Sequence, residues 1–163
     1  GVLNGARWCA DLQRRYADFT EEDRRRFDEA EWLDPALVAR AGCLCLEAGA
    51  VAAVHLSWRE RHPVATLRDL LRRAGLPRGV PVARCAPGCS KGEAVARFLR
   101  AAARWDAVES YAVLNDETLS DELPDPARHV RVDGSVGLTE ADAARVRALL
   151  LLPVAPGGAI LER

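Results

Sequence analysis

The sequence predicts an α/β domain with helices on both faces of a mostly parallel, doubly wound sheet, which makes three layers. Short apolar segments of strand length alternate along the chain with longer segments of helical period. Such alternation is typical of parallel strands joined by right-handed helical crossovers. A length of 163 residues suffices for one domain with a full core, and 49% hydrophobic with 29% charged residues is an ordinary globular composition.

Cap residues mark where the helices begin. Asp34 stands before a proline at the first helical position, Ser90 and Glu93 have the spacing of a capping box, and Thr139 precedes the last helical segment. Apolar runs such as AVAAVHL separate the helices and are short enough to be strands buried on both faces. The expected helices are residues 35–48, 63–74, 91–105 and 139–151, and the expected strands are residues 50–56, 80–85, 110–114 and 129–132.

The alternation does not include the first part of the chain. Residues 5–33 are rich in arginine and acidic side chains with apolar residues interspersed, and we interpret them as an inserted helical flap. Residues 1–152 are expected to form a single domain. The proline- and glycine-containing residues 153–163 are expected to be a loose tail.

The composition disfavours several classes of protein. Basic and acidic side chains nearly cancel, with a formal net charge of −1, so no extended nucleic-acid surface is expected. No apolar run reaches the roughly 18 residues of a membrane span and no signal-peptide pattern is present, which predicts a cytoplasmic location. Five cysteines and three scattered histidines favour neither a disulfide framework nor a zinc site.

Polar side chains stand where the predicted strands end, the place where doubly wound sheets bind ligands. Asn4, Ser57 and Asp116 follow such strands, and Lys91, the one lysine of the chain, begins the helix that leads to the Asp116 strand. A hydroxyl, a cation and a carboxylate at one sheet edge suit a phosphate and a divalent metal. Each residue also has a purely structural interpretation: Ser57 as a turn residue, Lys91 as a solvated side chain, and Asp116 as the cap of its own turn.

Five segments of the chain resemble, in order, the sequence motifs of one known family. GVLN at the start resembles the segment after the two aspartates of the first motif, and AVAAVHLSWRE resembles the second-motif strand. SKGEAVARFL and VESYAVLNDE resemble the segments that carry the third-motif lysine and the fourth-motif acidic pair. HVRVDGSVGLTEADAARVRALL resembles the C-terminal signature of the HAD domains in Swiss Army Knife RNA repair proteins and their stand-alone bacterial relatives. The family that these motifs together resemble is the haloacid dehalogenase (HAD) superfamily.

The resemblance implies a Rossmann-like HAD core and a magnesium-dependent phosphohydrolase that acts on a phosphomonoester through an aspartyl-phosphate. Ser57 and Lys91 would be its catalytic and phosphate-binding residues, and Asn4 would also lie at the phosphate. Asp116 and Asn115 would hold the Mg²⁺ ion. The nucleophile and the general acid–base belong to the first motif and are expected upstream of Gly1.

The start of the chain leads to a further expectation. The chain begins at a glycine and contains no methionine, so we expect a fragment whose first strand is largely missing and that is inactive by itself. The expected partner of the longer protein is a small phosphorylated substrate or the phosphate at a nucleic-acid end, with no membrane involved.

Two other functions stay open. Asn115 stands where the family pattern has an aspartate, and His55-Leu56-Ser57 stands where it has a serine run, which motivates a catalytically silent HAD-like binding or interaction module. An ordinary nucleotide-binding α/β domain is disfavoured, because no glycine-rich phosphate loop follows any predicted strand.

Overall fold

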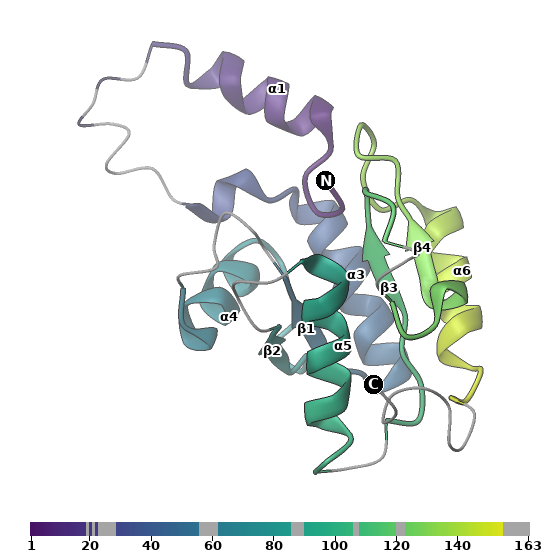
Figure 1. Ribbon diagram of the computed structural model, residues 1–163. Coiled ribbons are helices and arrows are strands. Elements are labelled where there is room, and N and C mark those ends of the chain that lie inside the picture. The colour runs from purple at the N-terminus through teal and green to yellow at the C-terminus, as the bar shows by residue number, and fades with distance from the viewer. Residues whose placement is uncertain are drawn as a thin grey trace.

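Helices and short strands alternate through most of the chain. The computed structural model describes residues 1–18, 20, 22, 29–55, 62–85, 90–105, 108–119 and 123–154 (Figure 1). Its elements are α1 (Ala6–Arg15), η1 (Glu29–Trp32), α3 (Pro35–Ala48), β1 (Ala52–Val54), α4 (Val64–Arg73), β2 (Val82–Arg84), α5 (Lys91–Ala102), β3 (Val113–Asn115), η3 (Pro126–Arg128), β4 (His129–Arg131) and α6 (Glu140–Leu150). The predicted α/β class is thereby confirmed.

The described strands form two separate parallel sheets of two strands each. Strand β1 pairs with β2, with Ala52 opposite Val82, and β3 pairs with β4, with Val113 opposite His129. Both pairings are parallel, as the alternation predicted. A single continuous sheet is not formed among the described strands, so the three-layer doubly wound core stays a prediction.

Strand β3 is covered on both of its faces. Val113 belongs to a core cluster with Leu99 of α5, whereas the next residue, Leu114, packs against the cluster that includes Val146 of α6. Because successive strand residues point to opposite faces, the two helices lie on opposite sides of β3. Because both faces of β3 are buried, the residues that point to either face, Val113 and Leu114, are apolar.

Helix α3 contributes to two clusters at once. Val38 packs in a cluster with Leu71 of α4, and Leu44 packs in another with Val146 of α6. The N-terminal segment joins the same two clusters, because Val2 packs against the second and Leu3 against the first. Residues 1–4 therefore lie between the part of the core that holds β1 and β2 and the part that holds β4.

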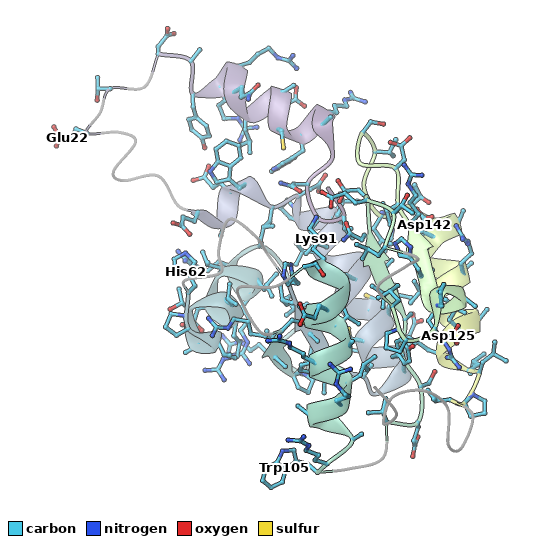
Figure 2. All side chains as sticks on the ribbon, viewed as in Figure 1. Glu22, His62, Lys91, Trp105, Asp125 and Asp142 are labelled. Atoms are coloured by element: carbon cyan, nitrogen blue, oxygen red, sulfur yellow. The ribbon has the colours of Figure 1, made fainter. Side chains whose placement is uncertain are left out.

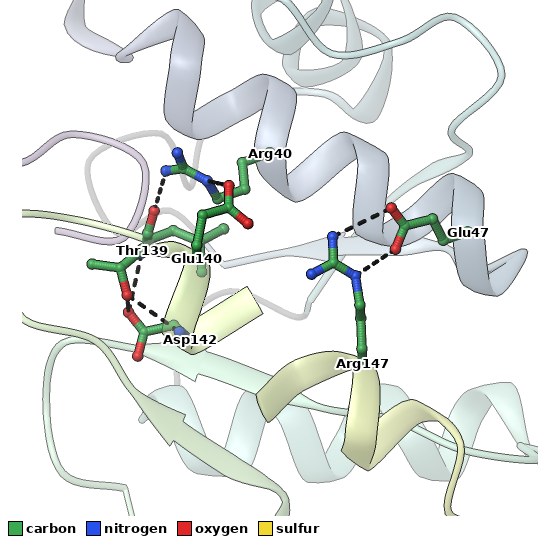
Figure 3. A network of polar contacts seen from close by, with 7 residues as sticks. Arg40, Glu47, Thr139, Glu140, Asp142 and Arg147 are labelled. Carbon is green, nitrogen blue, oxygen red and sulfur yellow. Dashed lines mark hydrogen bonds and ion pairs between the residues drawn. The ribbon is translucent and has the colours of Figure 1, made fainter. Parts of the chain in front are cut away.

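Polar contacts fix α6 against α3 (Figure 3). Arg40 of α3 bonds Glu140 at 2.6 Å and the backbone oxygen of Leu138, and Arg147 of α6 bonds Glu47 at 2.6 Å. Since the paired side chains are partly or fully exposed, each pair contributes little stability by itself and mainly sets the alignment of the two helices.

The helix caps agree with the sequence in two cases and differ in one. Asp34 accepts a hydrogen bond from the backbone of Ala36, and Thr139 forms a complete capping box with Asp142 (Figure 3). At α5, Ser90 accepts from the Glu93 backbone, but the Glu93 carboxylate pairs with Arg97 one turn later. The predicted capping box is therefore only half formed, because an arginine at the i,i+4 position takes the carboxylate.

Strand β3 is shorter than predicted and lies further along the chain. It spans residues 113–115, whereas residues 110–114 were expected. The Ser110 hydroxyl lies 3.0 Å from the backbone oxygen of Leu149 and 2.8 Å from that of Leu152 and can donate to either, so this part of the chain is held by the end of α6. Pairing with β4 begins at Val113 and extends to Asn115, which brings the asparagine into the strand.

Helix α1 projects from the rest of the molecule in Figure 1, within the range predicted to be a flap. It buries Leu12, and the indole of Trp8 donates to the backbone oxygen of Glu31 in η1 at 3.0 Å. Its role as a flap, like the domain boundary at residue 152, stays a prediction. No helix among the described residues has the length and apolarity needed to cross a membrane.

Candidate functional site at the end of strand β3

A tight turn follows β3 and is held by the last residue of the strand. The buried Asn115 side chain accepts a hydrogen bond from the backbone of Glu117 through Oδ1 at 3.1 Å. Its backbone oxygen accepts from Val132, the residue after β4, at 2.8 Å. Asparagine favours such turns because its short side chain can bond the backbone two residues on. Asp116 and Glu117 are thereby presented beyond the carboxyl end of the strand.

The Asp116 carboxylate lies beside the first residue of the chain. Its Oδ2 atom is 3.6 Å from the nitrogen of Gly1, which also donates to the backbone oxygens of Asn4 and Gly134 at 3.1 Å each. The segment that begins the chain, the turn after β3 and the loop after β4 therefore meet at one place. Gly1 therefore lies close to the strand that carries Asp116.

The loop after β4 approaches Asp116 closely because it contains a glycine. A Cβ atom on Gly134 would lie 3.0 Å from Asp116 Oδ2 and 3.3 Å from Asp116 Cβ, so a larger residue would crowd the Asp116 side chain and require it to shift by a few tenths of an ångström. The neighbouring Asp133 accepts from the hydroxyl and the backbone of Ser135, and these hydrogen bonds lower the pKa of the Asp133 carboxyl. Asp133 is therefore an ionised, exposed group next to the same edge.

Lys91 reaches the same turn from α5. It is the first residue of that helix and lies at its upper end in Figure 2. Its ammonium nitrogen is 2.9 Å from Oε1 of Glu117, the residue directly after Asp116. A cation from the helix before β3 and a carboxylate from the turn after β3 are thus held within one short segment of the surface.

The structure brings together most of the residues that the sequence singled out. Asn4 and Asp116 meet around Gly1, Asn115 shapes the turn, and Lys91 contacts it through Glu117. Ser57 lies outside the described residues.

Two residues at this site, Glu117 and Gly134, were not singled out from the sequence. Glu117 stood within the strand-end segment but was passed over, because the family pattern directs attention to the acidic pair before it. Gly134 follows the last strand. The strand-end rule points to this loop, but the need for glycine depends on how closely the loop approaches Asp116.

The family described as the HAD domain in Swiss Army Knife RNA repair proteins matches residues 1–143. The chain belongs to this family. No curated protein and no solved structure matched the chain. As a HAD domain it is of the phosphohydrolase type, and the family match covers the segments that contain Asn4, Lys91, Asn115 and Asp116.

HAD enzymes generally use Mg²⁺, and the residues at this edge of the HAD domain fit that ion. Mg²⁺ takes oxygen ligands only, usually one or two carboxylates with several waters and substrate phosphate oxygens. The Asp116 carboxylate is an oxygen donor of this kind, whereas the backbone oxygens of Asn4 and Gly134 beside it accept hydrogen bonds from the Gly1 nitrogen. Among the residues that the structure describes, no group of three or more His, Cys, Asp or Glu side chains could hold a metal.

Proposed function

We propose that this HAD domain is the greater part of a magnesium-dependent phosphohydrolase that cleaves a phosphomonoester through an aspartyl-phosphate. The observation that carries the proposal is that the turn after β3 contains a carboxylate, Asp116, and is contacted by a lysine, Lys91, through the neighbouring Glu117. Phosphoryl transfer depends mainly on positioning and on neutralising charge on the phosphate oxygens. Asp116 as a metal ligand and Lys91 as a cation supply both the positioning of the phosphate and the neutralisation of its charge.

Each residue has a proposed role in that reaction. Lys91 neutralises negative charge between the nucleophile and the phosphate, and Asp116 binds Mg²⁺, which withdraws charge from a phosphate oxygen. Asn4 and Ser57 donate to phosphate oxygens. Asn115 is proposed as a second oxygen donor to the metal, although its Oδ1 already accepts from the Glu117 backbone and has one lone pair left.

The two carboxylates that do the covalent chemistry are proposed to precede Gly1, as the first motif of the family implies. One attacks phosphorus while the bond to the leaving oxygen breaks, and the other gives that oxygen a proton and later activates water. The packing of Val2 and Leu3 between two core clusters supports a strand that arrives there between β1 and β3. Such a strand would join the two sheets into the proposed three-layer core.

The proposed substrate is a small phosphorylated molecule or the phosphate at a nucleic-acid end. A formal net charge of −1 supports recognition of one phosphate group rather than of a long phosphate backbone. The proposed place of action is the cytoplasm, which the odd number of cysteines supports.

A catalytically silent HAD-like binding module is the second candidate. Asn115 favours it, because an uncharged amide in place of a carboxylate weakens Mg²⁺ binding, and its oxygen takes part in the turn. The two candidates differ in whether phosphate is released at all.

The test uses the chain expressed together with its upstream coding sequence. We expect phosphate release from an aryl phosphate in the presence of Mg²⁺, and no release when EDTA removes the metal. The chain that begins at Gly1 serves as the matched control and is expected to be inactive. Equal rates with Mg²⁺ and with EDTA, or no release from the longer protein, would reject the enzyme in favour of the silent module.

A further inference from the structure

We infer that Glu117 is a positioning residue that holds the Lys91 ammonium beside Asp116. This inference rests on the proposed function, because it assigns the residue that orients the lysine of that site. The contact itself is direct: Lys91 Nζ lies 2.9 Å from Glu117 Oε1. The Lys91 side chain is 26% exposed and the Glu117 side chain 63% exposed, so the pair lies at the surface with the lysine as its more enclosed member.

Lys91 needs a counter-ion because of its place in the helix. It is the first residue of α5, where the free backbone N–H groups carry partial positive charge and an ammonium is disfavoured. Glu93, the acidic residue in the same helical turn, is turned toward Arg97 instead. In the part of the chain that the structure describes, Glu117 is the acidic side chain that pairs with Lys91.

The backbone of Glu117 is held in place by the turn that follows β3. Its N–H donates to Asn115 Oδ1, and the Asn115 side chain is buried at the end of β3. A side chain that starts from a fixed backbone position loses less conformational freedom when it pairs than one on a loose loop. Asn115 thus fixes the conformation of the turn, and the turn fixes the backbone position of Glu117. Glu117 in turn fixes the position of the Lys91 ammonium.

This arrangement also gives a reason for asparagine at position 115. An amide oxygen accepts the Glu117 N–H as a carboxylate would, but it adds no charge to compete for Lys91. Glu117 then supplies the negative charge one residue beyond Asp116. An ammonium has three N–H donors, so Lys91 can contact a phosphate oxygen while it stays paired with Glu117.

The composition of the chain makes the contact measurable, because Lys91 is its one lysine. Protein labelled with ¹³C and ¹⁵N in lysine, on the chain that begins at Gly1, gives a single side-chain signal. We expect Glu117→Gln to move this signal, since the charge beside the ammonium is removed. Glu93→Gln, which removes one charge from the same region without touching Lys91, is the matched control and is expected to leave the signal in place.

The second part of the test measures turnover by the longer protein, which includes the upstream sequence. Glu117→Gln is expected to lower kcat about fivefold, the effect of losing one partly exposed ion pair, with an unchanged melting temperature and KM within about twofold. Glu93→Gln is expected to keep the full rate. An unmoved Lys91 signal, or a full rate in Glu117→Gln, overturns the positioning role. Lys91→Met separates the two proposals: a full rate in that variant overturns the proposed function, whatever the spectrum shows.

Discussion

Replacing Asp116 by asparagine in the longer protein is expected to lower phosphate release at least about a hundredfold, the scale seen when one group that stabilises transition-state charge is removed. The substitution keeps the size of the side chain and removes its charge. Asp116 is the carboxylate at the meeting point of three segments, and Asn115 beside it is already neutral. A second neutral amide leaves Mg²⁺ without a charged ligand from this turn.

The measurement is the steady-state rate as a function of Mg²⁺ concentration. Asp69→Asn is the matched control, because Asp69 is an exposed carboxylate on α4 and the net charge changes by the same amount. The control is expected to keep the wild-type rate and metal dependence. If Asp116→Asn retained the rate at saturating Mg²⁺, Asp116 would not be a metal ligand.

Replacing Arg128 by methionine is expected to lower the free energy of unfolding by about 3 kcal/mol, because a buried network loses its charged member. The Arg128 side chain is 8% exposed. Its Nη1 atom donates to the backbone oxygens of Leu149 and Leu152 at 2.8 Å each, and Nη2 donates to Pro153 at 2.9 Å. The guanidinium therefore ties the end of α6 to the start of β4.

Thermal and urea unfolding measure this effect. A loss of about 3 kcal/mol in a domain of this size corresponds to a fall in Tm of about 6–12 °C. Arg145→Met is the matched control: that arginine is 60% exposed and lies 3.9 Å from Asp142, so we expect a change within about 0.5 kcal/mol. Equal stability of the Arg128 and Arg145 variants would show that the buried network contributes nothing measurable.

Local signals made much of the fold predictable. Helix starts at Asp34 and Thr139 and the helix end at Gly49 follow from short-range chemistry, and they lie where the sequence predicted them. The extent of β3 was not predictable in the same way. Its start depends on contacts of Ser110 with the end of α6, which lies far along the chain.

The residues of the candidate site were likewise predictable only in part. Asp116 and Asn4 were predicted because strand ends in parallel sheets share one edge, and Lys91 because it begins the helix that leads to the Asp116 strand. The structure places these residues around the turn after β3. Glu117 was missed because its role depends on which side chain reaches it across the turn. Gly134 was missed because the need for glycine appears only when the loop after β4 is seen against Asp116.

The most direct test asks whether a metal bound through Asp116 lies beside Lys91. Mn²⁺ takes the oxygen ligands of Mg²⁺, and its unpaired electrons broaden the signals of nearby nuclei. In the lysine-labelled longer protein, with Lys91 assigned by Lys91→Arg, we predict that substoichiometric Mn²⁺ broadens the Lys91 signal, that excess Mg²⁺ restores it, and that Asp116→Asn prevents the broadening. A Lys91 signal that stays sharp in the wild type, or broadens equally in Asp116→Asn, would contradict a shared phosphate and metal site at the end of β3.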